Sequence, residues 1–314
     1  MNAVETIYPP DRVTLREAGL RDGLQLAKNW PDTAAKSAWI EAEYAAGIRH
    51  FEVGSFLPEA KFPQFADVRQ VIAATAALPG AHGVALAMNV RGAEAAIASG
   101  VPEIACVVSA TEAHSTRNAR RTMAEALATV REIGALRDAA AHRPLVSVGI
   151  AMAFGCSIAG EVAPGAVLRL VEMIAEAGAD VIALADTVGF AGPDQVSRLT
   201  AASLSLVGDI PLGIHLHDTR GLGLVNASAA IDAGARIVDA SIGGLGGCPF
   251  APRATGNIVM EDLAFLCQTK GLETGIDIER LIAVREIVAA AMPGETLHGA
   301  MARAGLPTAE LAGA

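Results

Sequence analysis

The chain alternates between short apolar runs and longer alanine-rich segments, and it does so eight times. Segments such as 33–46, 164–177 and 221–233 have the apolar spacing of amphipathic helices. A strand followed by a helix, repeated along one chain, predicts βα units that assemble a parallel sheet. The eight apolar runs, which we predict to be strands, lie at 13–19, 50–56, 83–89, 103–110, 145–154, 181–188, 211–218 and 237–245.

Four of the junctions between a helix and the next strand carry a glycine, at Gly47, Gly100, Gly178 and Gly234. Glycine readily takes the left-handed conformation that closes a helix. Eight βα units within about 250 residues match the count and size of a closed (β/α)8, or TIM, barrel. An open doubly wound sheet is the alternative, but it more often has fewer strands and a Gly-x-Gly-x-x-Gly turn. We therefore predict an α/β fold of the TIM-barrel type.

We expect one catalytic domain over residues 1–314, because no change in composition marks a second one. The barrel would cover about 13–270, and a C-terminal helical extension would cover about 271–314. Helices predicted at 277–291 and 295–304 would pack against the barrel or against a neighbouring subunit. We expect a homodimer or a higher homo-oligomer.

The formal net charge of −10 argues against a general nucleic-acid or membrane-surface binder. The N-terminus lacks the basic start and apolar stretch of a signal peptide, and no apolar span is long enough to cross a membrane. None of the four cysteines forms a Cys-x-x-Cys pair, which fits a reduced compartment. We expect a soluble, cytoplasmic protein with no nucleic-acid or membrane partner.

Polar residues gather where the predicted strands end, which is where barrel enzymes carry their chemistry. His215 and His217 lie two apart in a strand, so their side chains point to the same face. With the carboxylate of Asp22 and the amide oxygen of Asn257, they would form a mixed oxygen and nitrogen site that suits Mg²⁺ or Mn²⁺. Non-haem Fe(II) is a weaker alternative, and histidines satisfied by ordinary hydrogen bonds are another.

Glu52 occupies a strand position that would point it into the barrel. A buried carboxylate without a partner is costly, so we expect it to meet Arg21 or a metal-bound water. A purely structural ion pair between Arg21 and Glu52 is the simpler reading. Asp186 would orient a metal ligand, or else cap the end of its strand.

Cys248 follows the glycine-rich segment 243–247, on a loop at the expected mouth of the barrel. A thiol on a loop that closes over a substrate can deliver a proton. Cys106, Cys156 and Cys267 fit small buried residues better. Three arginines near the same mouth could receive the phosphates of coenzyme A or simply form a solvated helix face: Arg117, Arg120 and Arg121.

Three motifs together resemble the 3-hydroxy-3-methylglutaryl-CoA (HMG-CoA) lyase family of metal-dependent carbon–carbon lyases. They are Glu17-Ala-Gly-Leu-Arg-Asp-Gly-Leu-Gln25, His215-Leu-His-Asp-Thr219, and Gly244-Leu-Gly-Gly-Cys-Pro249 with Ala254-Thr-Gly-Asn257. They occur in the family's order, and the resemblance runs from about residue 13 to 275. It implies a TIM barrel that cleaves an acyl-CoA thioester by a retro-Claisen reaction.

The resemblance also implies roles for individual residues. Arg21 would steady an enolate oxygen, Cys248 would be the acid on a mobile loop, and Asp22 would be a ligand and a candidate base. Glu52 and Asp186 match functional positions of the family as well. The implied metal ligands are Asp22, His215, His217 and Asn257, and the expected substrate contacts are Arg21, Gln25, Ser55, Asn89 and Arg253.

The resemblance leaves the acyl group open. Leu26-Ala27, Met88, Ala185 and Arg253 depart from the usual lyase pattern, so the substrate could be HMG-CoA, citramalyl-CoA or another 3-hydroxyacyl-CoA. A Claisen condensing enzyme of the isopropylmalate or homocitrate synthase type is a further alternative. Those synthases are usually longer and lack the glycine-flanked cysteine. A catalytically silent binding barrel is hard to reconcile with a complete set of ligands, acid and base.

Overall fold

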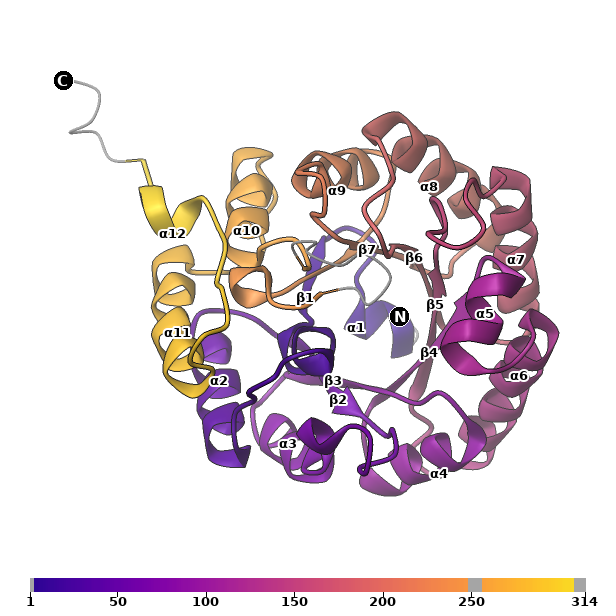
Figure 1. The fold of residues 1–314 in the computed structure, drawn as a ribbon, viewed down its shortest axis with the longest axis horizontal. Helices are drawn as coiled ribbons and strands as arrows, with labels where there is room; N and C mark the ends of the chain where they lie inside the picture. Colours follow the sequence, from indigo (N-terminus) through magenta and orange to yellow (C-terminus); the bar gives the residue numbers. More distant parts are fainter. Residues whose placement is uncertain (1–2, 248–255, 308–314) are drawn as a thin grey trace.

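The computed structural model describes residues 3–247 and 256–307. Eight parallel strands pair in sequence order and close into a barrel, because β1 pairs with both β2 and β8 (Figure 1). The TIM-barrel prediction is therefore confirmed. The strands are β1 (Thr14–Glu17), β2 (His50–Ser55), β3 (His82–Leu86), β4 (Glu103–Ser109), β5 (Leu145–Ala151), β6 (Val181–Asp186), β7 (Leu212–Leu216) and β8 (Ile237–Ala240).

A ring of helices surrounds the barrel, and α11 and α12 lie outside that ring (Figure 1). Asp32 caps α2 by accepting from the Ala35 N–H, and Pro164 occupies the first turn of α7. No helix in the described ranges is both long and apolar enough to cross a bilayer. The helices are α1 (Ala3–Ile7), α2 (Thr33–Ala45), α3 (Val68–Ala76), α4 (Val90–Ser99), α5 (Glu112–Ala119), α6 (Met123–Ala139), α7 (Pro164–Glu176), α8 (Pro193–Val207), α9 (Gly223–Asp232), α10 (Met260–Thr269), α11 (Ile278–Ala291) and α12 (Met301–Ala304).

The last predicted strand and the last predicted helix lose more than half of their predicted length in the structure. The strand predicted at 237–245 ends at Ala240, because the chain then forms a 3₁₀ turn over Ile242–Gly244, in which Gly243 and Gly244 have left-handed φ angles of 59° and 67°. The helix predicted at 295–304 is helical only from Met301. Arg285 binds the carbonyl oxygens of Leu297 and His298, so these groups are not available to a helix.

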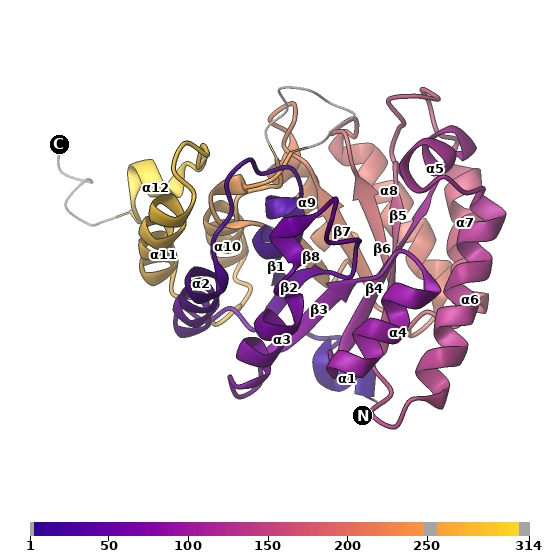
Figure 2. The same cartoon turned by 60° about the horizontal axis from the view of Figure 1, so that its bottom comes forward.

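The amino-terminal end of the barrel is closed by α1 and the residues after it (Figure 2). The Tyr8 hydroxyl donates to Glu103 at 2.7 Å, and the Tyr8 ring stacks on His50. His82 binds the same Glu103 carboxylate at 2.8 Å, and Arg16 approaches it from above at 3.4 Å. This buried polar layer separates the lower end of the barrel from the opposite end, where the strands finish.

The glycines at the four predicted junctions all have positive φ angles, of 107° at Gly47, 77° at Gly100, 85° at Gly178 and 110° at Gly234. At Gly47 a Cβ would lie 2.2 Å from the Gly275 carbonyl oxygen, whereas at Gly100 it would meet nothing within 4 Å. Gly47 is therefore required both by its backbone conformation and by the close approach of the segment before α11.

This difference predicts unequal costs for the same substitution. Gly100→Ala should lower the free energy of unfolding by about 1–2 kcal/mol, the cost of a left-handed alanine. Gly47→Ala should cost a further 1–3 kcal/mol or so, because the methyl group overlaps backbone. Urea unfolding followed by circular dichroism measures both, and equal losses would contradict the packing argument.

Candidate active site

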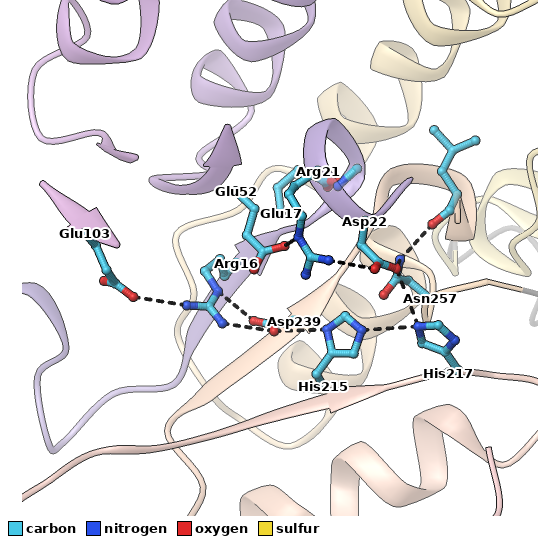
Figure 3. Close-up of polar contacts among 12 residues, drawn as sticks. Arg16, Glu17, Arg21, Asp22, Glu52, Glu103, His215, His217, Asp239 and Asn257 are labelled. Carbon is cyan, nitrogen blue, oxygen red and sulfur yellow. Dashed lines mark hydrogen bonds and ion pairs between the residues drawn. The ribbon is translucent and has the colours of Figure 1, made fainter. Parts of the chain in front are cut away.

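Arg21 and Asp22 lie on a π-helical turn, Gly19–Gly23, that follows β1. Such turns interrupt regular backbone and are frequent at functional sites. Gly19 is needed here because an added Cβ would lie 2.5 Å from Glu17 and 2.7 Å from Trp39. The turn presents both side chains to the centre of the barrel, as Figure 3 shows.

The side chains of Asp22, His215 and His217 converge at the carboxyl end of the barrel (Figure 3). Their potential ligand atoms all lie within 4.8 Å of one another. The two histidine Nε2 atoms are 3.2 Å apart, and His217 Nε2 is 3.5 Å from Asp22 Oδ2. Adjacent ligands about 2.1 Å from one ion would be about 3 Å apart, so the spacing fits a shared metal.

Asn257 completes this cluster from the other side of the loop that follows β8. Its side-chain N–H groups donate to Asp22 at 2.9 Å and to the Leu245 carbonyl at 2.8 Å. Its Oδ1 is buried and has no hydrogen-bond partner among the residues that the structure describes. A buried acceptor without a partner, next to a carboxylate and two imidazoles, is the arrangement expected of an oxygen atom that serves as a metal ligand. The four residues predicted as metal ligands are therefore together.

Asp239, in β8, contacts His215 of this cluster. It was not among the site residues predicted from the sequence. Its Oδ2 lies 3.1 Å from His215 Nδ1, while Arg16 donates to both carboxylate oxygens at 2.8 and 3.0 Å. A hydrogen bond at Nδ1 fixes the orientation of the ring and leaves Nε2 for a metal. The sequence feature that could have identified Asp239 is a single aspartate inside the apolar run 237–245. Glu52 was predicted from the same kind of feature.

Glu52 and Arg21 form the predicted ion pair, with Arg21 Nε 2.7 Å from Glu52 Oε2. Arg21 Nη1 also donates to Asp22 at 2.8 Å. Both carboxylates line the central cavity beside the guanidinium. Arg21 is thus held in one orientation by two anions and faces open space.

Electrostatics keep Asp22 ionised. Burial alone would raise the pKa of this carboxyl, but Arg21, His217 and His215 outweigh burial and hold the pKa well below its usual value. Burial alone would lower the pKa of His215, whereas its hydrogen bond to Asp239 and the charge of Asp22 raise it above the usual value. A metal would therefore compete with a proton at His215.

Asp186 does not line the cavity. Its two oxygens accept from the backbone N–H groups of Phe190 and Ala191 at 2.8 and 3.0 Å, so it shapes the loop after β6. The carboxylate in hydrogen-bond contact with His215 is that of Asp239. The structure thus places Asp186 at the end of its strand as a cap, the second of the two readings.

The predicted substrate contacts occupy different places. Gln25 and Asn89 line the cavity, and Asn89 also caps α4 by accepting from the Gly92 N–H. The Gln25 Oε1 atom is buried and has no hydrogen-bond partner in residues 3–247 and 256–307. Ser55 is buried outside the cavity lining. Cys248 and Arg253 lie outside the described residues.

The cavity has a volume of about 420 Å³ and reaches from the metal cluster to the mouth of the barrel. Lys61, Arg120 and Arg121 line it at or near the mouth, and Arg117 does not. The chain thus places three cations where an anionic group could enter. The described cysteines, Cys106, Cys156 and Cys267, are buried, and burial raises the pKa of Cys106 to about 12.

In a comparison with known protein families, a family model described as HMGL-like matches residues 12–288 of this chain. The chain belongs to the HMGL-like family. This HMGL-like protein is 37% identical over 307 residues to the (R)-citramalyl-CoA lyase of Chloroflexus aurantiacus, covering 94% of this chain and 95% of that one. It is 32% identical over 274 residues to a hydroxymethylglutaryl-CoA lyase of Bacillus subtilis, covering 87% and 91% of the two chains.

A solved structure of an HMG-CoA lyase from Acinetobacter baumannii, in complex with coenzyme A and 3-methylmalate, is also similar to this HMGL-like chain. It matches with a TM-score of 0.88 and 36% identity, covering 98% of each chain. The predicted family resemblance is therefore confirmed over most of the protein.

A cluster of three buried carboxyl groups supports the turn that carries Arg21 and Asp22. Glu17 accepts from the Gly19 N–H at 2.6 Å and from the Ile242 N–H at 3.0 Å. Glu261 accepts from the Gly243 N–H at 3.0 Å. Burial, together with the nearby charge of Glu261, raises the pKa of Glu17 to about 8, and burial beside Glu17 raises that of Glu43 well above its usual value.

These raised pKa values predict that stability falls as pH rises. Between about pH 4.5 and 8 the folded protein keeps protons that the unfolded chain has lost, so each such group lowers the free energy of unfolding by up to about 1.4 kcal/mol per pH unit. Denaturant unfolding across this range measures the slope. Glu43→Gln should make it shallower, whereas Glu41→Gln, on the exposed face of the same helix, should not; equal slopes in all three proteins would contradict the assignment.

A second prediction concerns Asp239 and metal binding. Asp239→Asn should weaken Mn²⁺ binding by roughly 10- to 100-fold, the usual effect of losing the group that orients a ligand histidine. Isothermal titration calorimetry at pH 7 measures the affinity, and circular dichroism verifies the fold. Unchanged affinity in a folded variant would show that Asp239 does not orient His215.

Proposed function

We propose that this chain is an acyl-CoA lyase that performs a divalent-metal-dependent retro-Claisen cleavage. The substrate is a 3-hydroxyacyl-CoA thioester that carries a carboxylate, of the HMG-CoA or citramalyl-CoA type, and the products are acetyl-CoA and a keto acid. The observation that carries the proposal is the cluster of Asp22, His215 and His217 beside Arg21 at the inner end of a cavity, in a chain of this family.

The cluster would be completed by Asn257 and would hold Mg²⁺ or Mn²⁺, because it offers oxygen and imidazole ligands and no thiolate. A bound divalent ion supplies Lewis-acid stabilisation of negative charge that develops on substrate oxygens. Asp22 suits the role of ligand, since its lowered pKa keeps it ionised. That same low pKa makes it a weak proton acceptor.

Arg21 supplies the second positive charge. When the carbon–carbon bond breaks, its electrons move onto the thioester carbonyl as an enolate, and the 3-hydroxyl oxygen becomes a ketone as its proton leaves. The guanidinium, fixed by Glu52 at 2.7 Å and by Asp22 at 2.8 Å, would stabilise the enolate oxygen without having to reorganise. Glu52, which also lines the cavity beside Arg21, would accept the proton that leaves the 3-hydroxyl group.

The enolate carbon must then take up a proton to become the methyl group of acetyl-CoA. We assign this step to Cys248, which follows the glycines of the loop after β8. At the mouth, Lys61, Arg120 and Arg121 would bind phosphates of coenzyme A. Gln25 and Asn89, which line the cavity, would contact the acyl part. Asp186 would act on the reaction only indirectly, through the loop after β6.

The decisive assay follows acetyl-CoA release from HMG-CoA and from citramalyl-CoA with Mg²⁺ or Mn²⁺. Cleavage of at least one thioester, abolished by EDTA and restored by metal, is the expected result. Asp22→Asn should lower kcat/KM by roughly 10²- to 10⁴-fold, while Asp209→Asn, exposed before β7 at the other end of the barrel, serves as the control.

Two other outcomes of these assays would replace the proposed lyase function with a different one. If no thioester is cleaved but acetyl-CoA condenses with a 2-oxo acid, the protein is a condensing synthase. If the protein binds neither a divalent metal nor an acyl-CoA, it is a binding barrel without this activity. Undiminished turnover by Cys248→Ser would remove that thiol from the mechanism while leaving the lyase assignment intact.

A further inference from the structure

Three adjacent strands of the barrel line its interior with unusually small side chains. Ala105 in β4, Gly149 and Ala151 in β5, and Ala183 and Ala185 in β6 all line the central cavity. The interior of a TIM barrel is normally filled with bulky branched residues such as valine, isoleucine and leucine. Three adjacent strands therefore leave open a space that other barrels fill, and we call this space the β4–β6 recess.

Gly149 shows that the recess is not a by-product of tight packing. Its φ angle is not among the positive ones, and a Cβ built on it would meet only the Cys106 carbonyl oxygen, at 3.8 Å. By contrast, a Cβ on Gly213 in β7 would lie 3.3 Å from the Ala183 Cβ. An alanine could therefore occupy position 149 without a close contact, and glycine there keeps the cavity wide.

The β4–β6 recess faces the proposed metal site. In the closed order of eight strands, β5 lies opposite β1, which leads into the turn that carries Arg21. Ala185 in β6 is the register partner of His215, so the recess and the histidine pair are at the same depth. A substrate held by the metal cluster would therefore direct one of its substituents into the recess.

The strand residues that line the recess are largely apolar, whereas His114, Asn118 and Thr187, which also line the cavity, follow the ends of β4 and β6. Leu86, Met88 and Val107 extend the alanine and glycine lining. Ser147 provides one hydroxyl at the deeper level, and this hydroxyl has no hydrogen-bond partner within the described part of the chain. Arg16, which reaches the same depth, is already bound to Asp239 and Glu103. Among the described residues of β4, β5 and β6 that line the cavity, Ser147 supplies the only hydroxyl, so the space between these strands suits an alkyl group better than water.

We propose that the β4–β6 recess binds the substituent on C3 of the substrate, and that this substituent is an aliphatic branch longer than methyl. This inference rests on the proposed lyase function and specifies its substrate class. A methyl group would leave the recess largely empty. Each further methylene that fits an apolar pocket can change kcat/KM by roughly 10-fold or more.

The test compares two thioesters that differ only in the branch at C3, methyl or n-propyl, on whichever acid backbone is cleaved. The wild-type protein should cleave the propyl compound with a kcat/KM at least equal to that for the methyl compound. Gly149→Val should lower the propyl-to-methyl ratio of kcat/KM by at least about 10-fold. Gly149→Ala should shift the ratio in the same direction by less.

Gly165→Val is the matched control, because it makes the same change on the exposed outer surface of α7 and should leave the ratio unaltered. Circular dichroism verifies that the variants fold, and Gly149→Ala still decides the matter if the valine variant does not. Cleavage of the methyl compound alone by the wild type, or an unchanged ratio in both Gly149 variants, overturns the inference and leaves the lyase function standing. Cleavage of neither compound overturns both.

Discussion

The carboxylate of Asp239 connects the two strands that close the barrel to the histidines of the proposed metal site. Asp239 is the register partner of Arg16 in β1 and of His215 in β7, and its carboxylate forms hydrogen bonds with both side chains. The barrel interior has a low effective dielectric, so a buried guanidinium there needs an anion in contact. The pairing of β8 with β1 places the Asp239 carboxylate beside the Arg16 guanidinium and so supplies this anion. The orientation of His215 therefore depends on barrel closure as a whole, and no single βα unit can produce the site.

A second set of buried groups links the two segments that deliver the remaining ligands. Glu17 holds the backbone after β1 and the backbone after β8 at once, and Glu261 holds the next residue of the second segment. Asp22 and Arg21 come from the first segment, and the second leads to Leu245, whose carbonyl fixes Asn257. The positions of three functional side chains, those of Arg21, Asp22 and Asn257, are thus set by carboxyl groups that do not line the cavity.

Periodicity was sufficient to predict the barrel and the histidine pair. Eight apolar runs gave the eight strands, and spacing by two placed His215 and His217 on one face. The same sequence signal, a charged residue within an apolar run, was applied to Glu52 and not to Arg16 or Asp239. Recognising those two as partners requires the register between β8 and β1, which no local pattern contains. The helix expected at 295–304 failed for a similar reason, because Arg285, from another helix, captures its carbonyl groups.

The closed lower end of the barrel has a consequence for the order of events. Tyr8, Glu103 and Arg16 fill the axis beneath the cavity, and α1 covers them from outside (Figure 2). A thioester that enters by the cationic mouth would place its acyl group innermost and its nucleotide outermost. Both products would then share a single exit. The keto acid would form farther inside the cavity, so it could leave only after acetyl-CoA. The positions of the two products would therefore set the order of their release.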